Sequence, residues 1–269
     1  TCRLYKSKVS QNTMDAESME KELVEFLRKD HNPIDIGAPY GQKFPVYPGE
    51  VVILQAPPKS MKTMLLQNLV NKFKRKTYFM EMEMSPRQMW MRFVMIENQW
   101  CEEELIQYYS EYANGISKNF NWLTVDYSSC YPHELHKRIM MLPQKPEIVV
   151  VDHMGLFKSK RQDNNMKVEE VSQALMELAI QNNIIVFAVC EITKQAMVAE
   201  ITKSAFAEGM NIASSKGSFR VAYNANKVLS LTPFKDENQL IKSLHLQSTA
   251  NREKENLDIH LPVKNALIG

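Results

Sequence analysis

Residues 51–73 read VVILQAPPKSMKTMLLQNLVNKF, and this stretch decides the fold class. Residues 51–56 form a short, continuous apolar run, which is typical of a parallel strand buried on both faces. Residues 63–73 have helical spacing. A polar loop joins the two, so the stretch predicts a buried strand, a tight loop and a helix in immediate succession.

The loop within this stretch, QAPPKSMKT (residues 55–63), has the outline of the phosphate-binding pattern G-x-x-x-x-G-K-[ST]. Lys62 and Thr63 occupy its last two places, whereas Ala56 and Met61 stand where both glycines are expected. Two interpretations are open: a nucleotide site with an altered loop, or a chance lysine-threonine pair. Position favours the first, because backbone N–H groups at the start of a helix hold phosphate oxygens.

The same alternation of strand and helix continues along the chain. Apolar runs at 77–83, 121–127, 147–153 and 184–192 are separated by helical patterns at 85–97, 132–142 and 168–183. Such alternation predicts right-handed crossovers and a doubly wound α/β domain, whose mainly parallel sheet carries helices on both faces. Strand-like runs at 227–234, 240–249 and 256–263 predict antiparallel strands added at the C-terminal end.

We expect two parts: a linker over residues 1–47 and the α/β domain over residues 48–269. The linker contains one amphipathic helix near residues 15–29, which either packs on its own domain or docks on a neighbouring subunit. The chain begins at Thr1 rather than methionine, which indicates a processed product or a fragment of a longer protein.

Composition narrows the class of protein. The 33 basic and 31 acidic residues give a net charge of +2, so any nucleic-acid surface must be a local basic patch. The four cysteines show no metal-ligand spacing, which indicates a reducing setting. No apolar run reaches the length of a membrane span, so we expect a protein of the cytoplasm, or of the host cytoplasm if it is viral.

A second acidic feature supports the nucleotide interpretation. The run EIVVVDH places Asp152 at the carboxyl end of a buried strand. A carboxylate there can orient Mg²⁺ opposite a phosphate loop, although a strand that ends in aspartate is common in α/β proteins. The set of Lys62, Thr63 and Asp152 is more specific than any one of them.

Three runs together carry a family resemblance: YPGEVVILQAPPKSMKT (47–63), YFMEMEMSPRQMWMRF (78–93) and IVVVDHMGL (148–156). They resemble the RecA-like motor domain of hexameric replicative DNA helicases, the DnaB-like and Twinkle-like group, from about Pro48 to the C-terminus. The run MEMS at 82–85 is its most specific part.

The resemblance implies ATP or another nucleoside triphosphate with Mg²⁺, the ion being held by Thr63 and Asp152. It implies catalytic roles for Lys62, for Glu83 as the base at the end of the strand beside the phosphate loop, and for Arg252 as an arginine finger toward the next subunit. The implied nucleotide-binding residues are Ala56, Pro57, Pro58, Lys59, Ser60, Met61, Lys62, Thr63, Asp152 and Glu191. Simple surface or helix-capping charges remain the alternative for Glu81, Glu83 and Arg252.

The sequence also departs from the family pattern. Met61 replaces a glycine, and Glu191 stands where these helicases place a glutamine near the γ-phosphate. Ala250 replaces a lysine and Asn226 an aspartate. These departures bear on hydrolysis more than on nucleotide binding.

Basic loops at the carboxyl ends of the strands are the expected contact with single-stranded DNA, with solvated charge as the alternative. They contain Lys158, Lys160, Arg161, Lys167, Lys194, Lys203, Lys216 and Arg220.

Two functions follow. The first is an ATP-dependent helicase motor that works in DNA replication as a homo-oligomer, a hexameric ring, with primase or other replication proteins as partners and a phage-type origin. The second is a RecA-like nucleotide-binding accessory protein of replication or recombination that hydrolyses ATP weakly or not at all.

Overall fold

The computed structural model describes residues 15–28, 33–112, 115–191, 224–252 and 255–268. Contacts divide the chain into two units, Thr1–Asn32 and Pro33–Gly269. The described part of the first unit is Asp15 followed by helix α1 (Ala16–Arg28). The second unit therefore begins before residue 48, where the sequence places the start of the α/β domain.

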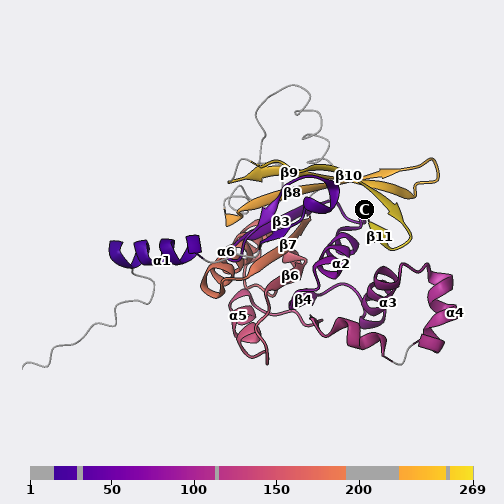
Figure 1. The fold of residues 1–269 in the computed structure, drawn as a ribbon, viewed down its shortest axis with the longest axis horizontal. Helices are drawn as coiled ribbons and strands as arrows, with labels where there is room; N and C mark the ends of the chain where they lie inside the picture. Colours follow the sequence, from indigo (N-terminus) through magenta and orange to yellow (C-terminus); the bar gives the residue numbers. More distant parts are fainter. Residues whose placement is uncertain (1–14, 29–32, 113–114, 192–223, 253–254, 269) are drawn as a thin grey trace, which may run out of the picture. The chain divides into compact units, whose positions relative to one another are not determined.

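One nine-stranded sheet organises the second unit, in the order β11-β10-β9-β8-β3-β7-β6-β4-β5 (Figure 1). Its parallel members are β3 (Val51–Ala56), β4 (Thr77–Glu81), β5 (Leu123–Asp126), β6 (Ile148–Asp152), β7 (Ile185–Glu191) and β8 (Lys227–Lys235). Its antiparallel members are β9 (Ile241–Asn251), β10 (Asp258–Lys264) and β11 (Leu267–Ile268). The predicted fold class is confirmed, with β8 as a further parallel strand beside β3.

A small sheet and eight helical segments complete the described part of this unit. The small sheet pairs β1 (Ile34–Asp35) with β2 (Pro45–Val46) around the 3-10 turn η1 (Ala38–Tyr40). The α-helices are α2 (Lys62–Phe73), α3 (Pro86–Asn98), α4 (Glu102–Tyr112), α5 (Pro132–Met140) and α6 (Asn164–Asn182). The other 3-10 turns are η2 (Ile116–Phe120) and η3 (Met154–Leu156). Helix α4 was not expected from the sequence.

The two faces of β3 explain why its sequence is apolar throughout. Val52 and Leu54 belong to one core cluster, which includes Leu65 of α2. Val51 and Ile53 belong to the other, which includes residues of α5 and α6. Successive side chains of a strand point to opposite faces, so each face contributes its own layer. Burying each such side chain contributes about 1.5–3 kcal/mol.

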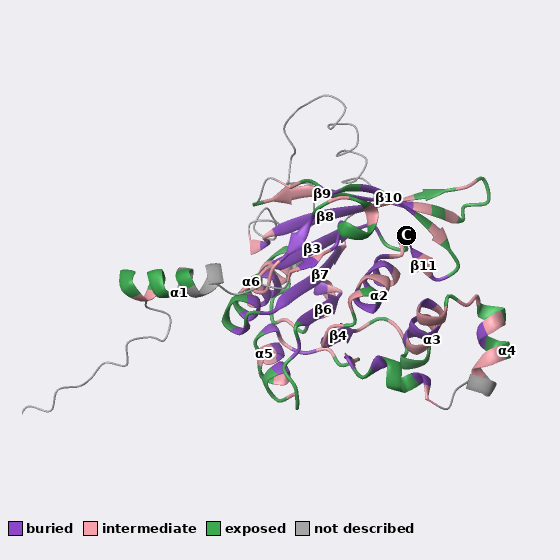
Figure 2. Cartoon of the chain, viewed as in Figure 1, coloured by how far each residue is buried: buried purple, intermediate pink, exposed green. Residues whose placement is uncertain are grey.

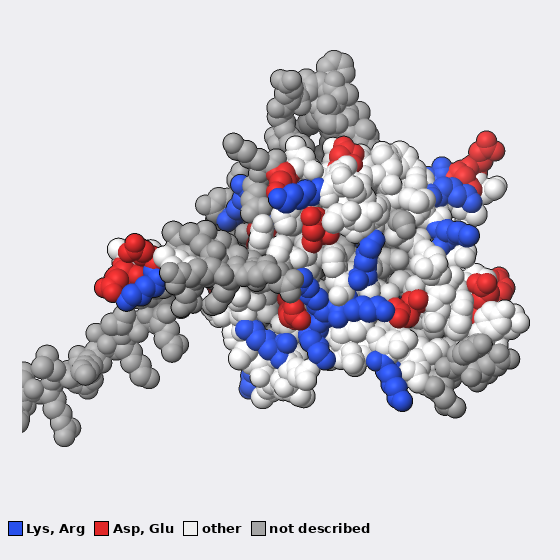
Figure 3. Space-filling view, in the orientation of Figure 1, with Lys and Arg blue, Asp and Glu red and all other residues white. Residues whose placement is uncertain are grey.

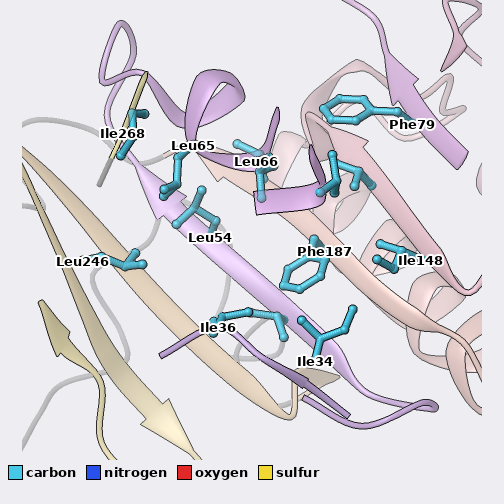
Figure 4. Packing of buried hydrophobic residues seen from close by; sticks show 14 of the residues in the cluster. Ile34, Ile36, Leu54, Leu65, Leu66, Phe79, Ile148, Phe187, Leu246 and Ile268 are labelled. Atoms are coloured by element: carbon cyan, nitrogen blue, oxygen red, sulfur yellow. The ribbon is translucent and has the colours of Figure 1, made fainter. Parts of the chain in front are cut away.

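The buried positions follow the central strands, which are coloured purple in Figure 2. Figure 4 shows Leu54, Leu65 and Phe187 packed in the first cluster, with Leu246 of the antiparallel extension beside them. The antiparallel strands therefore share the core of the parallel sheet. Of the described helices, none has the length and apolar character that crossing a membrane requires.

Candidate nucleotide site

Strand order brings four residues to one edge of the sheet. The parallel register pairs Ala56 of β3 with Glu191 of β7, and Glu81 of β4 with Asp152 of β6. Because β7 and β6 are neighbours, the carboxyl ends of the four strands lie in a row. The expectation that β4 lies beside the phosphate loop is wrong, since β7 and β6 separate β4 from β3.

Residues 57–61 form the loop between β3 and α2. Met61 is left-handed, with φ 64° and ψ 22°, and Lys59 also has a positive φ of 60°. Met61 therefore adopts the conformation for which the pattern uses glycine, at a cost of about 1–2 kcal/mol. Its side chain packs against the core, and its carbonyl accepts the N–H of Leu65 at 2.9 Å in the first turn of α2.

Thr63 and Asp152 meet at the start of α2, as the sequence predicts for a pair that serves one site. The Thr63 hydroxyl donates to Oδ2 of Asp152 at 2.5 Å. Asp152 is fully buried, and its Oδ1 has no hydrogen-bond partner among the described residues. Burial raises the pKa of Asp152 to about 6, although the hydrogen bond from Thr63 acts in the opposite direction.

These residues fit a magnesium ion and a phosphate group. A hydroxyl and a carboxylate are hard oxygen ligands, which Mg²⁺ prefers, and a buried carboxylate oxygen without a partner needs a cation or a donor. In the loop, the Ser60 hydroxyl is likewise buried without a partner among the described residues. The start of α2 adds backbone N–H groups suited to an anion.

Lys62 is nearly buried and forms an ion pair with Glu191 at the end of β7. This contact engages the ammonium group expected to reach the terminal phosphates. It also explains how a glutamate is accommodated in a phosphate site: a lysine offsets its negative charge.

Glu81 and Glu83 have different environments. Strand β4 ends at Glu81, which is buried, and its Oε1 accepts the N–H groups of Glu83 at 2.8 Å and Met84 at 2.9 Å. Burial raises the pKa of Glu81. Glu83 lies in the bend after the strand rather than at its end, with 43% of its side chain exposed. Glu81 is therefore no solvated charge, because it holds the bend that presents Glu83.

His153 lies beside these carboxylates and was not predicted from the sequence. Its Nε2 lies 3.1 Å from Oε1 of Glu83 and 4.0 Å from Oε2 of Glu191, while its Nδ1 accepts the N–H of Gly155 at 3.0 Å. A neutral imidazole that accepts through Nδ1 carries its proton on Nε2, so this ring donates to Glu83. Its place directly after Asp152 was the available signal.

Arg92 of α3 is a second site residue that was not predicted. It is partly buried, and burial lowers its pKa, whereas the negative charges of Glu81 and Asp152 act in the opposite direction. The helix that carries it begins in a capping box made by Ser85 and Gln88. Arg92 thus supplies positive charge behind two buried carboxylates.

The expected DNA-binding residues fall into three groups. Lys158, Lys160 and Arg161 are exposed in the loop before α6. Lys167 differs, because its Nζ donates to the carbonyl of Gly155 at 2.6 Å. Lys194, Lys203, Lys216 and Arg220 lie outside the described residues. On the face drawn in Figure 3, basic and acidic side chains are interspersed.

Arg252 is exposed at the end of β9, and its N–H donates to the carbonyl of Asn226 at 3.2 Å. Asn226 in turn accepts the N–H of Val51 through Oδ1 at 2.9 Å. The asparagine thus provides the acceptor that an aspartate would provide there. Ala250, in the place of the lysine, packs against the second core cluster.

Comparisons with known proteins agree with this geometry. The model of a family described as DnaB-like helicase C terminal domain matches residues 45–204. A solved structure of an isolated ATPase domain gives a TM-score of 0.72 at 13% identity, covering 94% of this chain and 99% of that one. A DnaB-like replicative helicase, solved with its interactions with primase, gives 0.68 at 12% identity, covering 95% and 66%. RadB recombinase gives 0.57 at 15% identity, covering 87% and 95%.

At these identities the solved structures establish the fold. No curated protein sequence matches the chain at a significant level.

Proposed function

The chain belongs to the DnaB-like helicase C-terminal domain family, and from this premise we propose that it is an ATP-driven motor domain that moves on single-stranded DNA during replication. The observation that carries the proposal is the contact between Thr63 and the buried carboxylate of Asp152, at the start of the helix that follows the loop. Both side chains would hold Mg²⁺. Bound Mg²⁺ would neutralise charge on the phosphate oxygens of ATP.

The remaining site residues have separate tasks. The loop 57–61 and Lys62 would bind the phosphates, and Lys62 would exchange Glu191 for them. Glu83 would accept a proton from the attacking water, for which its partly exposed carboxylate is accessible. Arg252 would stabilise the transferring phosphoryl group of a neighbouring subunit.

This last task requires a homo-oligomer, which we take to be a hexameric ring. The exposed loop with Lys158, Lys160 and Arg161 would contact the DNA backbone, and this binding should weaken as salt rises. Primase is a proposed partner, because a DnaB-like replicative helicase of similar fold interacts with it.

ATP hydrolysis, measured with and without single-stranded DNA, tests the proposal. We expect DNA to stimulate the parent and Lys62→Ala to lower the rate about 100-fold or more. Lys145→Ala, at an exposed lysine before β6, is the matched control and should behave as the parent. A parent that binds nucleotide but does not hydrolyse it would contradict the motor.

That outcome would favour the second candidate, a nucleotide-binding accessory protein. Two features support it: the left-handed Met61 in the phosphate loop, and the engagement of Lys62 by Glu191. Both oppose entry of a triphosphate.

A further inference from the structure

A second group of metal-ligating side chains lies outside the nucleotide site, on β9 and β10. His245, Asp258 and His260 each offer a ligand atom, and these atoms all lie within 4.8 Å of one another. We propose that this group, the β9–β10 histidine cluster, binds a divalent transition-metal ion, with Zn²⁺ as the physiological class. This inference does not rest on the proposed motor function.

The sheet register places the three ligands together. His245 lies directly opposite His260 in the antiparallel pair, where the Cβ atoms of facing residues are about 4.5–5.5 Å apart. Asp258 precedes His260 by two residues and therefore shares its face. The intervening residues of both strands, including Leu244, Leu246 and Ile259, are buried on the opposite face. The core thus fixes which side the ligands occupy.

Local contacts support these positions. Nε2 of His245 lies 2.8 Å from Oδ1 of Asp258, and the two imidazole rings stack with centroids 4.3 Å apart. Phe234 of β8 lies against both rings, at 6.4 Å and 5.8 Å between centroids. The side chain of Gln42 brackets the backbone of Asp258, accepting its N–H and donating to its carbonyl. The ligands are therefore held before any ion arrives.

The ligand types select the metal. Two imidazole nitrogens and one carboxylate oxygen suit Zn²⁺ and its neighbours, whereas Mg²⁺ prefers oxygen ligands only. The stacked rings must turn about χ2 to face a shared ion. His260 is exposed and His245 partly exposed, so solvent leaves room for that rotation and for water as the remaining ligand.

The other group with metal-ligating atoms, formed by Glu83, His153 and Glu191, suits such an ion less well. Its imidazole accepts an N–H through Nδ1, which places its proton on the Nε2 that a metal would need. Lys62 also occupies Glu191. In the sheet, β8 and β9 separate β10 from β3 and the nucleotide loop.

Calorimetric titration of the full chain with Zn²⁺, without nucleotide, tests the site. We expect a dissociation constant on the order of 1–10 µM. His245→Ala and His260→Ala should each weaken binding about tenfold or more, and Asp258→Asn should weaken it less. Because the rings are at the surface, these variants should melt at the parent's temperature.

Two controls separate this site from other ligands. His133→Ala on α5 and His153→Ala at the nucleotide site should bind Zn²⁺ as the parent does. Titration with Co²⁺ should give visible bands without the near-ultraviolet bands of thiolate coordination, since the cluster contains no cysteine. The proposal is overturned if the parent binds no Zn²⁺, if the double variant His245→Ala/His260→Ala binds it equally well, or if thiolate bands appear.

Discussion

At the scale of single residues, the nucleotide site is dominated by charges that are already paired. Lys62 contacts Glu191, Thr63 contacts Asp152, and Glu83 contacts His153. Each contact engages a group that the proposed reaction requires. Nucleotide binding must therefore compete with at least the first of these pairs, and removing a partner should have a measurable effect.

Glu191→Gln should tighten ATP binding about five- to tenfold, because it keeps the shape of the side chain while removing the negative charge that holds Lys62 and faces the phosphates. Binding of a fluorescent ATP analogue would measure the change. Glu170→Gln, at an exposed glutamate of α6, removes one negative charge elsewhere and should have no effect. Equal or weaker binding by Glu191→Gln would show that the ion pair does not oppose the nucleotide.

His153 should act as a positioning residue for Glu83 if the proposed motor function holds. His153→Ala should lower kcat about five- to tenfold with little change in KM, because the carboxylate loses the donor that orients it. His153→Gln, whose amide can still donate, should recover much of the rate. Equal kcat values for the alanine and glutamine variants would argue against a role for the donated hydrogen bond.

At the scale of elements, the buried strands were predictable and their order was not. The runs that became β3, β6 and β7 are apolar on both faces, which marks them as central parallel strands whatever their order. Lys62, Thr63 and Asp152 were predictable for the same reason, since each lies at the end of such a strand or the start of the next helix. The roles of Glu81 and His153 depend on β4 and β6 being neighbours, which local sequence does not specify.

The phosphate loop is the element in which side-chain packing and backbone conformation conflict. Met61→Gly and Met61→Ala lose the same packing, but only glycine removes the cost of the left-handed backbone. Met61→Gly should therefore be more stable than Met61→Ala by about 1 kcal/mol, as measured by urea unfolding. At Met64, inside α2, the order should reverse by about 1 kcal/mol. A more stable Met61→Ala would contradict the left-handed conformation.

At the scale of the whole molecule, the two halves of the proposed catalytic apparatus lie on different parts of the sheet. The loop and its acidic partners lie at the carboxyl ends of β3, β7, β6 and β4. Arg252 lies at the end of β9, from which β8 separates β3. This arrangement supports a site completed by two subunits, one providing the loop and the other the arginine.

Mixing inactive variants tests that division directly. Lys62→Ala disables the loop of its own subunit, and Arg252→Ala removes the arginine offered to the neighbour, so each variant alone should hydrolyse ATP about 100-fold or more slowly than the parent. In a mixed oligomer, an Arg252→Ala subunit keeps an intact loop and can receive the arginine of a Lys62→Ala neighbour. Hydrolysis should therefore reappear on mixing and peak near equal amounts, whereas a double variant mixed with either should restore nothing. If mixed oligomers form, as native mass spectrometry would show, but remain inactive, Arg252 does not act between subunits.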